Sequence, residues 1–462
     1  MPAIITKDFR IQNANQFSES FSESADTYYL AIGRPQAFAN DQAFNDGTDT
    51  SPPTPVDSVG SVDYYVYDDL LSAKKISSSN VSAVIPRRNW TTGTTYDYYR
   101  HDYGEINSAG STIAANSGAT TLHDATFYVM NSTFDVYKVI DNNGDSASTV
   151  EPTGNKSTSV FSTGDSYKWK YMYSLSASEQ ANFLSTDFMH VSTESTDYST
   201  TAGAIENAKV TAGGSGGTNG TYTNVDIRGD GSSGKATVVV SSNAVTSVTI
   251  TTAGSGYTFA SVLASDIGSV SGADIDFIIS PPGGHASDAV AELGGFFVMM
   301  NVDFATSESG EFNTSNDFRR IALLRNPTDS TTGSTATAST LDATKSMTFS
   351  GTPGSFQADE KITQASSGAV GFVVDFNSTT KVLRYIQPQF TNQGVDSNGN
   401  LTAFSSTNTV TGATSGATGT PSSHDITPEL TADSGDILYI ENRKPISRAS
   451  DQTENVKLIV EF

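Results

Sequence analysis

The sequence predicts a mainly β protein, with a layered β-sandwich body, a few short helices in side loops and two inserted repetitive β modules. Charged residues make up only 16% of the 462 residues, below the usual share, and Gly, Ser and Thr take their place. Segments rich in Val, Ile, Thr and Tyr alternate with Gly and Asn, which is typical of strands separated by turns. With 24 Phe and 19 Tyr, the chain has enough apolar surface to fold.

The first hundred residues mix strand and loop patterns. Residues 27–38 (TYYLAIGRPQAF) predict a strand that ends in a Gly-Arg-Pro turn. The proline-rich loop TSPPTPVDSVGS follows, and it ends in the candidate helix N-caps Asp57 and Ser58. The next segment, VDYYVYDDLLSAKKI, has acids early and lysines late, which favours a helix. Its aromatic residues also fit a strand, and both alternatives stay open.

Residues 123–175 predict three strands, in the segments ATFYVMN, FDVYKVIDNN and DSYKWKYMYSL. The last segment alternates apolar and polar positions, so it should place its large aromatic residues on one face. These residues are Tyr167, Trp169, Tyr171 and Tyr173. Ser176 then stands three residues before Glu179, which predicts a capping box at the start of a short helix.

Two stretches have a different, repetitive texture. In residues 205–280, VTAGGSGGTNGTYTNV is echoed by ITTAGSGYTFASV, and KATVVVSS and AVTSVTITT between them predict two strands. In residues 331–424, Ile362–Gly371 (ITQASSGAVG) recurs as Val410–Gly419 (VTGATSGATG) with six of ten positions identical. Such repeats are typical of stacked β units. The predicted domains are therefore a discontinuous body (1–204, 281–330 and 425–462) and two β inserts (205–280 and 331–424).

Charge and composition exclude several classes of function. Fifty acids against 26 bases give a net charge of -24, which argues against a nucleic-acid-binding protein. The absence of Cys excludes disulfides, Cys-zinc sites and Cys nucleophiles. The N-terminus lacks the pattern of a signal peptide, and the most apolar run, Phe296–Val302, is too short to span a bilayer. We therefore expect synthesis in the cytoplasm and no membrane insertion.

Two motifs resemble ligand-binding loops but depart from them at a decisive position. GDGSSGKA (residues 229–236) has the spacing of a phosphate loop, but Ala236 follows the lysine and a strand pattern follows Ala236. DNNGDSAS places Asp141, Asn143 and Asp145 at alternate positions, as calcium loops do, but the twelfth position is Pro152 instead of Glu. Ordinary turns are favoured at both places.

The sequence contains no convincing set of catalytic or metal-binding residues. His285, Asp288 and Glu292 could share one helix face, but a capped helix start after PPGG is favoured. No two histidines have the spacing of a zinc pair, and GGSGG (residues 213–217) resembles a nucleophile elbow only through its glycines. We predict no enzymatic activity, no cofactor and no metal.

Two basic-aromatic segments remain, SAVIPRRNW and YIENRKPISRASDQTE. Arg and Trp are enriched among interface anchors, so these segments are candidates for protein–protein contacts. The alternative is that an arginine pairs with an internal carboxylate while the tryptophan packs in the core. The interface or fold-organising candidates are Arg87, Arg88, Trp90, Arg443, Arg448, Asp451 and Gln452.

Six blocks occur along the chain in the order in which they occur in a known family: AIGRPQAF, PPTPVDSV, AVIPRRNW, GDSYKWKYMYSL, DFRRIALLRNP and YIENRKPISRASDQTENVKLIVEF. Together they resemble the baseplate wedge subunit of T-even-type contractile-tailed phages, the dimeric wedge protein called gene product eight. The resemblance covers about half of the chain, residues 1–100, 160–200, 281–330 and 425–462. The two repetitive modules look instead like repeats of phage tail and fibre proteins, particularly from marine and cyanobacterial phages.

This resemblance implies a β-sandwich homodimer in the tail baseplate of the virion, assembled in the host cytoplasm. It implies contacts with other baseplate wedge proteins and displacement when the baseplate rearranges and the sheath contracts, with no catalysis and no cofactor. An alternative is a receptor- or glycan-binding tail protein that acts through its inserts, because aromatic-lined β surfaces often hold sugars. A polysaccharide-degrading enzyme is a third hypothesis, motivated only by the many acids and the β repeats.

Overall fold

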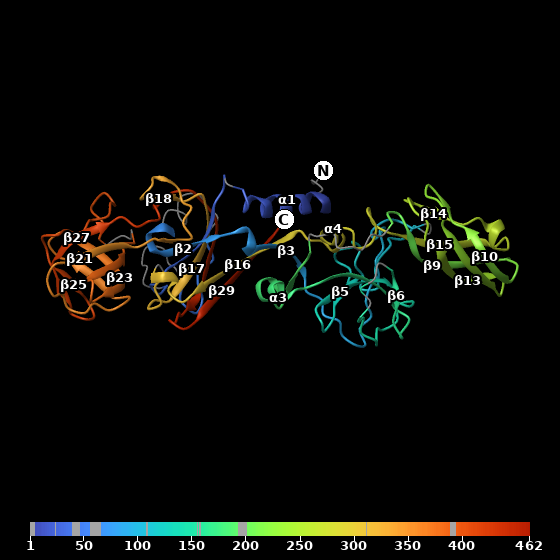
Figure 1. Ribbon diagram of the computed structural model, residues 1–462, viewed down its shortest axis with the longest axis horizontal. Helices are drawn as coiled ribbons and strands as arrows, with labels where there is room; N and C mark the ends of the chain where they lie inside the picture. Colours follow the sequence, from blue (N-terminus) through green and yellow to red (C-terminus); the bar gives the residue numbers. More distant parts are fainter. Residues whose placement is uncertain are drawn as a thin grey trace. The chain divides into compact units, whose positions relative to one another are not determined.

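The computed structural model describes residues 5–23, 25–38, 47–55, 66–107, 110–154, 156, 159–192, 201–310, 312–388 and 394–462 (Figure 1). Strands dominate these residues and the helices are short, so the prediction of a mainly β protein is confirmed. The chain divides into two compact units, one of Met1–Gln16, Ser82–Met299 and Ile459–Phe462, the other of Phe17–Val81 and Met300–Leu458. The predicted division into a body and two inserts is a different partition and stays a prediction.

The core of the first unit is built around a four-stranded sheet with the order β4-β5-β7-β6. Its strands are β4 (Tyr128–Met130), β5 (Asp135–Asp141), β6 (Phe161–Ser162) and β7 (Lys168–Ser174). Trp169, Tyr171 and Tyr173 are buried, and so are the residues between them, because β7 is covered on both faces. The alternating pattern therefore predicted the strand but not the burial of both its faces, since Lys170 is as buried as Trp169.

Short elements complete this part of the first unit. β3 (Val81–Pro86) pairs with β8 (Phe188–His190). The helix α3 (Ala177–Phe183) begins with the predicted capping box, since Ser176 Oγ accepts from the Glu179 amide and the Glu179 carboxylate accepts from the Ser176 amide. α4 (Ala289–Leu293) is capped by Asp288, whose carboxylate accepts from the Ala291 amide at 2.9 Å.

Residues 205–280 form a set of β-strands with their own apolar cluster. The long pair β9 (Ile205–Ser215) and β15 (Ser271–Ile279) accompanies a three-stranded sheet of β10 (Gly220–Asp226), β12 (Lys235–Ser241) and β13 (Ala244–Thr252). β12 and β13 are the two strands that the sequence predicted. GDGSSGKA connects β11 (Arg228–Gly229), which pairs with β14 (Ala260–Ser261), to β12, so the turn favoured over a phosphate loop is confirmed.

The second unit contains a five-stranded antiparallel sheet with the order β20-β2-β1-β17-β28. Its strands are β1 (Tyr28–Gly33), β2 (Leu70–Ile76), β17 (Phe318–Arg325), β20 (Thr340–Asp342) and β28 (Asp436–Ile446). The segment DDLLSAKKI, for which helix and strand were both open, is a strand from Leu70, preceded by one 3-10 turn, η1 (Tyr67–Asp69). The candidate N-caps Asp57 and Ser58 lie outside the described residues.

The two repeats of residues 331–424 fold as equivalent hairpins within a seven-stranded sheet. The first repeat forms β22 (Lys361–Gln364) and the start of β23 (Ala369–Asn377), the second forms β25 (Val410–Gly412) and β26 (Thr418–Gly419), and β22 pairs with β25. The turns share their chemistry, because the hydroxyls of Ser367 and Ser415 accept from the amides of Ala369 and Ala417. Gly368 and Gly416 both have positive φ (80° and 66°), which explains why this glycine recurs.

Further strands of this sheet are β21 (Lys345–Phe349), β24 (Val382–Ile386) and β27 (Pro421–Ile426). Four elements cross the residues at which the two units divide: α1 (Lys7–Ser20), β3, β16 (Phe297–Ala305) and β29 (Thr453–Glu461). The remaining short elements are β18 (Thr328–Asp329), β19 (Ser334–Thr335), η2 (Ser78–Asn80), η3 (Ala264–Ile267) and η4 (Glu308–Gly310). None of the helices in the described ranges combines the length and apolarity that a membrane span requires.

Candidate functional site

Arg88, in the segment that follows β3, turns its side chain toward the protein. Its guanidinium donates to the carbonyl oxygens of Ala125 and His123, the latter at 3.4 Å, and lies 4.6 Å from the ring centre of Tyr128. Its own carbonyl accepts from the Met130 amide at 2.7 Å, which holds the segment against β4. The partners of Arg88 are thus carbonyls and an aromatic face, where the sequence suggested a carboxylate. These contacts suit a fold-organising role.

Arg87 and Trp90 tie the same segment to two other loops. Arg87 donates to the Ser185 carbonyl at 2.8 Å and to the Asn89 side chain at 3.0 Å. The indole of Trp90 donates to Ser148 Oγ at 3.1 Å and packs against the edge of the main apolar cluster of the first unit. The segment SAVIPRRNW therefore fixes three neighbouring loops of its own unit, while its tryptophan stays half-buried.

The C-terminal candidates divide into one buried and three outward side chains. The Arg448 side chain is 0% exposed, and it donates to Glu454 at 2.7 Å and to the carbonyls of Thr306 and Asn313 at 2.6 and 3.2 Å. Arg443 is half exposed and pairs with Glu441, its neighbour on β28, at 2.8 Å. The side chains of Asp451 and Gln452 are exposed. Arg448 thus organises the fold of the second unit, and Arg443 remains available to a partner.

Sequence reasoning missed a chain of polar contacts that begins at Ser82, inside SAVIPRRNW. Ser82 Oγ lies 2.7 Å from His190 Nδ1, and His190 Nε2 lies 3.1 Å from a Glu179 carboxylate oxygen. Burial lowers the pKa of His190, so the imidazole stays neutral near pH 7. Ser82 lies within strand β3, whereas a nucleophilic serine is presented on a sharp turn beside oxyanion donors. These polar contacts therefore join β3, β8 and α3.

A second cluster that sequence reasoning missed is a set of charges inside the first unit. Lys138 on β5 and Lys170 on β7 lie directly opposite each other, and both are 0% exposed. Lys138 forms an ion pair with Glu292 of α4, whose carboxylate also accepts from the amides of Ala286 and Asp288 at 3.1 and 3.3 Å. Buried charges that are paired and hydrogen-bonded in this way fix how elements pack. Loss of one partner destabilises the fold, because the other charge then stays buried and unpaired.

The predicted alternatives for His285, Asp288 and Glu292 are thereby decided. His285 precedes α4 and is buried, Asp288 caps the helix, and Glu292 faces Lys138. The three side chains serve separate purposes, and the capped helix start is confirmed. DNNGDSAS is a turn in which Asn143 and Asp145 have positive φ. Within the part of the chain that the structure describes, no group of His, Asp or Glu side chains is arranged to hold a metal ion.

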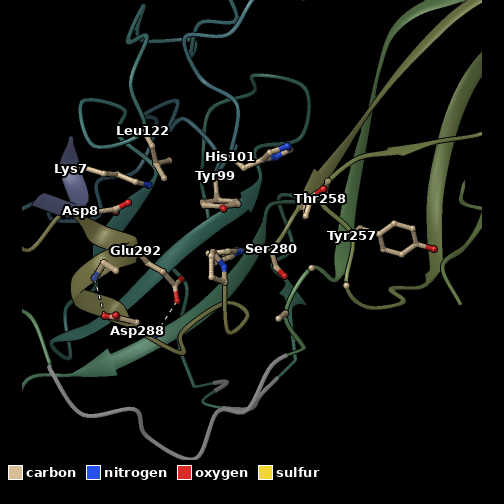
Figure 2. A pocket seen from close by; sticks show the side chains of 17 residues that line it. Lys7, Asp8, Tyr99, His101, Leu122, Tyr257, Thr258, Ser280, Asp288 and Glu292 are labelled. Atoms are coloured by element: carbon tan, nitrogen blue, oxygen red, sulfur yellow. Dashed lines mark hydrogen bonds between the residues drawn. The ribbon is translucent and has the colours of Figure 1, made fainter. Parts of the chain in front are cut away.

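A cavity of about 760 Å³ lies beside the buried charges, in the first unit (Figure 2). Tyr99 and Glu292 form part of its lining, together with Lys7 and Asp8 of α1 and His101. The Tyr257 ring points away from the cavity, and its hydroxyl donates to the Ile227 carbonyl at 3.0 Å. Because the lining carries charges of both signs and most of its carboxylates serve the fold, it selects no particular class of ligand.

The pH dependence of stability should report the buried lysines. Burial lowers the pKa of Lys170 to about 8, well below its value of roughly 10.4 in an unfolded chain. Between these values the unfolded protein holds a proton that the folded protein lacks, so stability should rise with pH, by up to ~1.4 kcal/mol per unit. We expect urea unfolding at pH 8 and 9 to show that the wild type gains stability relative to Lys170→Met as the pH rises. Parallel curves for the two proteins would contradict it.

The contacts described above define a mainly β protein, in which clusters of polar side chains hold strands and loops together. Residues 3–146 match the model of the family described as Bacteriophage T4, Gp8. This N-terminal region belongs to the Gp8 family of baseplate wedge proteins, and the resemblance found in the sequence is confirmed. No curated protein matches the chain.

The family gives the chain its place and its general role. The match of residues 3–146 to the Gp8 family supports a structural role in a phage tail baseplate, and therefore in the virion, and the family suggests association with other baseplate proteins. A structural family also fits the prediction that the chain is not an enzyme. The absence of activity, the marine or cyanobacterial origin and the assembly in the host cytoplasm stay predictions.

Proposed function

We propose that the protein is a homodimeric wedge subunit that links neighbouring wedge proteins and moves in the baseplate rearrangement that triggers sheath contraction. The match of residues 3–146 to the Gp8 family is the observation that carries this proposal. The inward contacts of Arg88 and Arg448 support it, because the two basic-aromatic segments then build the fold that presents the contact surfaces.

The helix α1, which lies within the matched region, supplies a candidate contact surface. Phe9 on this helix is 56% exposed and Ile5, just before it, is 64% exposed. Large apolar side chains that stay exposed close together on a helix mark protein–protein contacts more often than solvated surface. We therefore assign α1 to a contact with another wedge protein.

Replacing Phe9 with aspartate should weaken assembly with wedge proteins of the same phage at least ~10-fold while leaving the melting temperature unchanged, because an exposed side chain contributes little to folding. Co-sedimentation with those proteins and thermal melting would test this. Leu263→Asp is the matched control, since Leu263 is 46% exposed but lies in the Gly-rich region. Equal assembly by Phe9→Asp and wild type would exclude α1, and a wild type that binds no wedge protein would overturn the proposed function.

The alternative, a receptor- or glycan-binding role for the repetitive modules, has less support. The aromatic residues that suggested it point inward: Tyr257 is buried, and the Tyr222 hydroxyl donates to the Thr218 carbonyl at 2.8 Å. Phe259 is the aromatic residue of residues 205–280 that remains well exposed, at 61%. Sugar-binding surfaces combine exposed rings with polar groups free to bind hydroxyls, so the alternative rests on Phe259.

A further inference from the structure

The strand β28 is exposed to an unusual degree for its length and composition. None of its eleven residues is buried, whereas β17, to which it is hydrogen-bonded, is buried at all positions except the last. Leu438 and Tyr439 in β28 are 44% and 40% exposed. Among the described residues, β28 is the edge of its sheet and has β17 as its one neighbouring strand.

Local geometry explains why these side chains are turned outward. The register between β17 and β28 shifts between Leu323 and Leu324, so Tyr439 and Ile437 face consecutive residues of β17 and Leu438 between them has no opposite residue. Such a bulge re-aims side chains at the edge of a sheet. A long edge with exposed aliphatic and aromatic residues promotes association unless a partner covers it.

The charges of this region favour a second copy of the chain as that partner. The protein carries a net charge of -24, so two copies repel each other over most of their surfaces. Residues 436–446 are an exception, with two acids against two bases. Within β28 the acids Asp436 and Glu441 come first and the bases Arg443 and Lys444 come last. A strand with this order is complementary to an antiparallel copy of itself, which is what a two-fold contact requires.

We infer that β28 forms the two-fold contact of the homodimer, in which the strands of two copies pack antiparallel about an axis between Tyr439 and Ile440, with Leu438 beside it. Asp436 of each copy then lies beside Arg443 and Lys444 of the other. Both charged ends are accessible: Asp436 and Arg443 are 57% and 50% exposed despite their contacts with Arg325 and Glu441. The inference rests on the proposed homodimer and assigns it a surface.

The first test replaces Leu438 with lysine, a residue that natural edge strands use to prevent pairing. We expect analytical ultracentrifugation of the full chain to show a dimer for the wild type and a dimer Kd at least ~10-fold higher for Leu438→Lys, because a charged side chain would replace a large apolar one inside the contact. Ile426→Lys is the control, since Ile426 is 48% exposed at the end of β27 and should leave the dimer unchanged.

The second test uses the absence of cysteine from the chain. A single cysteine at Tyr439 should form an intermolecular disulfide under mild oxidation, because residues near a two-fold axis lie within the reach of an S–S bond. Ile426→Cys should stay uncross-linked. If circular dichroism shows that Leu438→Lys is unfolded, the cross-linking of Tyr439→Cys alone tests the β28 contact. A wild-type dimer that neither change affects would overturn this surface and leave the homodimer intact, whereas a monomeric wild type would overturn the homodimer as well.

Discussion

Arg448→Met is expected to lower the free energy of unfolding by about 3–5 kcal/mol, because it leaves a carboxylate without its partner in the interior of the second unit. Arg448 is fully buried and Glu454 is only 12% exposed, so water cannot replace the lost guanidinium. The change also removes the donors to the carbonyls of Thr306 and Asn313. An unpaired buried acceptor adds to the cost of an unpaired buried charge.

Urea unfolding followed by circular dichroism would measure the loss. Arg228→Met is the matched control, since Arg228 pairs with Asp266 at 3.2 Å but is 50% exposed. Pairs of that kind contribute at most ~1 kcal/mol, because solvent screens them and two long side chains must be ordered. A loss in Arg448→Met no larger than in Arg228→Met would show that the Arg448 contacts form a surface pair and do not organise the fold.

Features that depend on residues close in sequence were predicted well. The capping box of Ser176 and Glu179, the strands β12 and β13 and the turn at residues 229–236 are local, and the structure confirms each of them. The repeats at 362–371 and 410–419 also fold alike, because each contains a complete hairpin, with a serine that accepts from the backbone and a glycine at positive φ. Local chemistry of this kind leaves its pattern in the sequence.

The polar clusters could not be predicted, because their members are far apart in the chain. Ser82 and His190 are separated by 108 residues, and Lys138 and Glu292 by 154. The pattern of β7 placed Tyr167, Trp169 and Tyr173 in one row but contained no sign that Lys170 on the other face would be buried too. Charges from two distant segments, Glu206 of β9 and Glu292 of α4, act on Lys170, and their approach depends on the tertiary fold. Composition also could not separate Arg448, which is buried, from Arg443, which is half exposed.

The segment SAVIPRRNW illustrates how family markers and functional surfaces differ. A basic pair beside a tryptophan suggested an anchor for a partner, yet Arg88 lies over Tyr128 and donates to backbone carbonyls of its own unit. The motif that carries the family resemblance therefore makes its contacts within its own unit. The proposed contact surfaces are instead Phe9 on α1 and Leu438 on β28, two exposed apolar side chains that belong to neither basic-aromatic segment.

Lys138→Met is expected to destabilise the first unit by about 3–5 kcal/mol, since the Glu292 carboxylate would remain buried without its direct ion-pair partner. The double variant Lys138→Met with Glu292→Leu should regain much of this loss, because an apolar pair of similar volume carries no cost of removing charges from water. A double-mutant cycle from urea unfolding of the four proteins would measure the coupling between the two side chains.

The same sheet offers a control for this cycle. Lys156 pairs with Asp135 at 2.7 Å, but it is 47% exposed, so Lys156→Met should cost at most ~1 kcal/mol. The two lysines have similar contacts, since each pairs with one carboxylate and lies near one tyrosine ring. The difference between their losses of stability therefore isolates the effect of burial. A coupling for Lys138 and Glu292 as small as that of the exposed pair would mean that water reaches the cluster through the neighbouring cavity, and that α4 is held to the sheet by apolar packing alone.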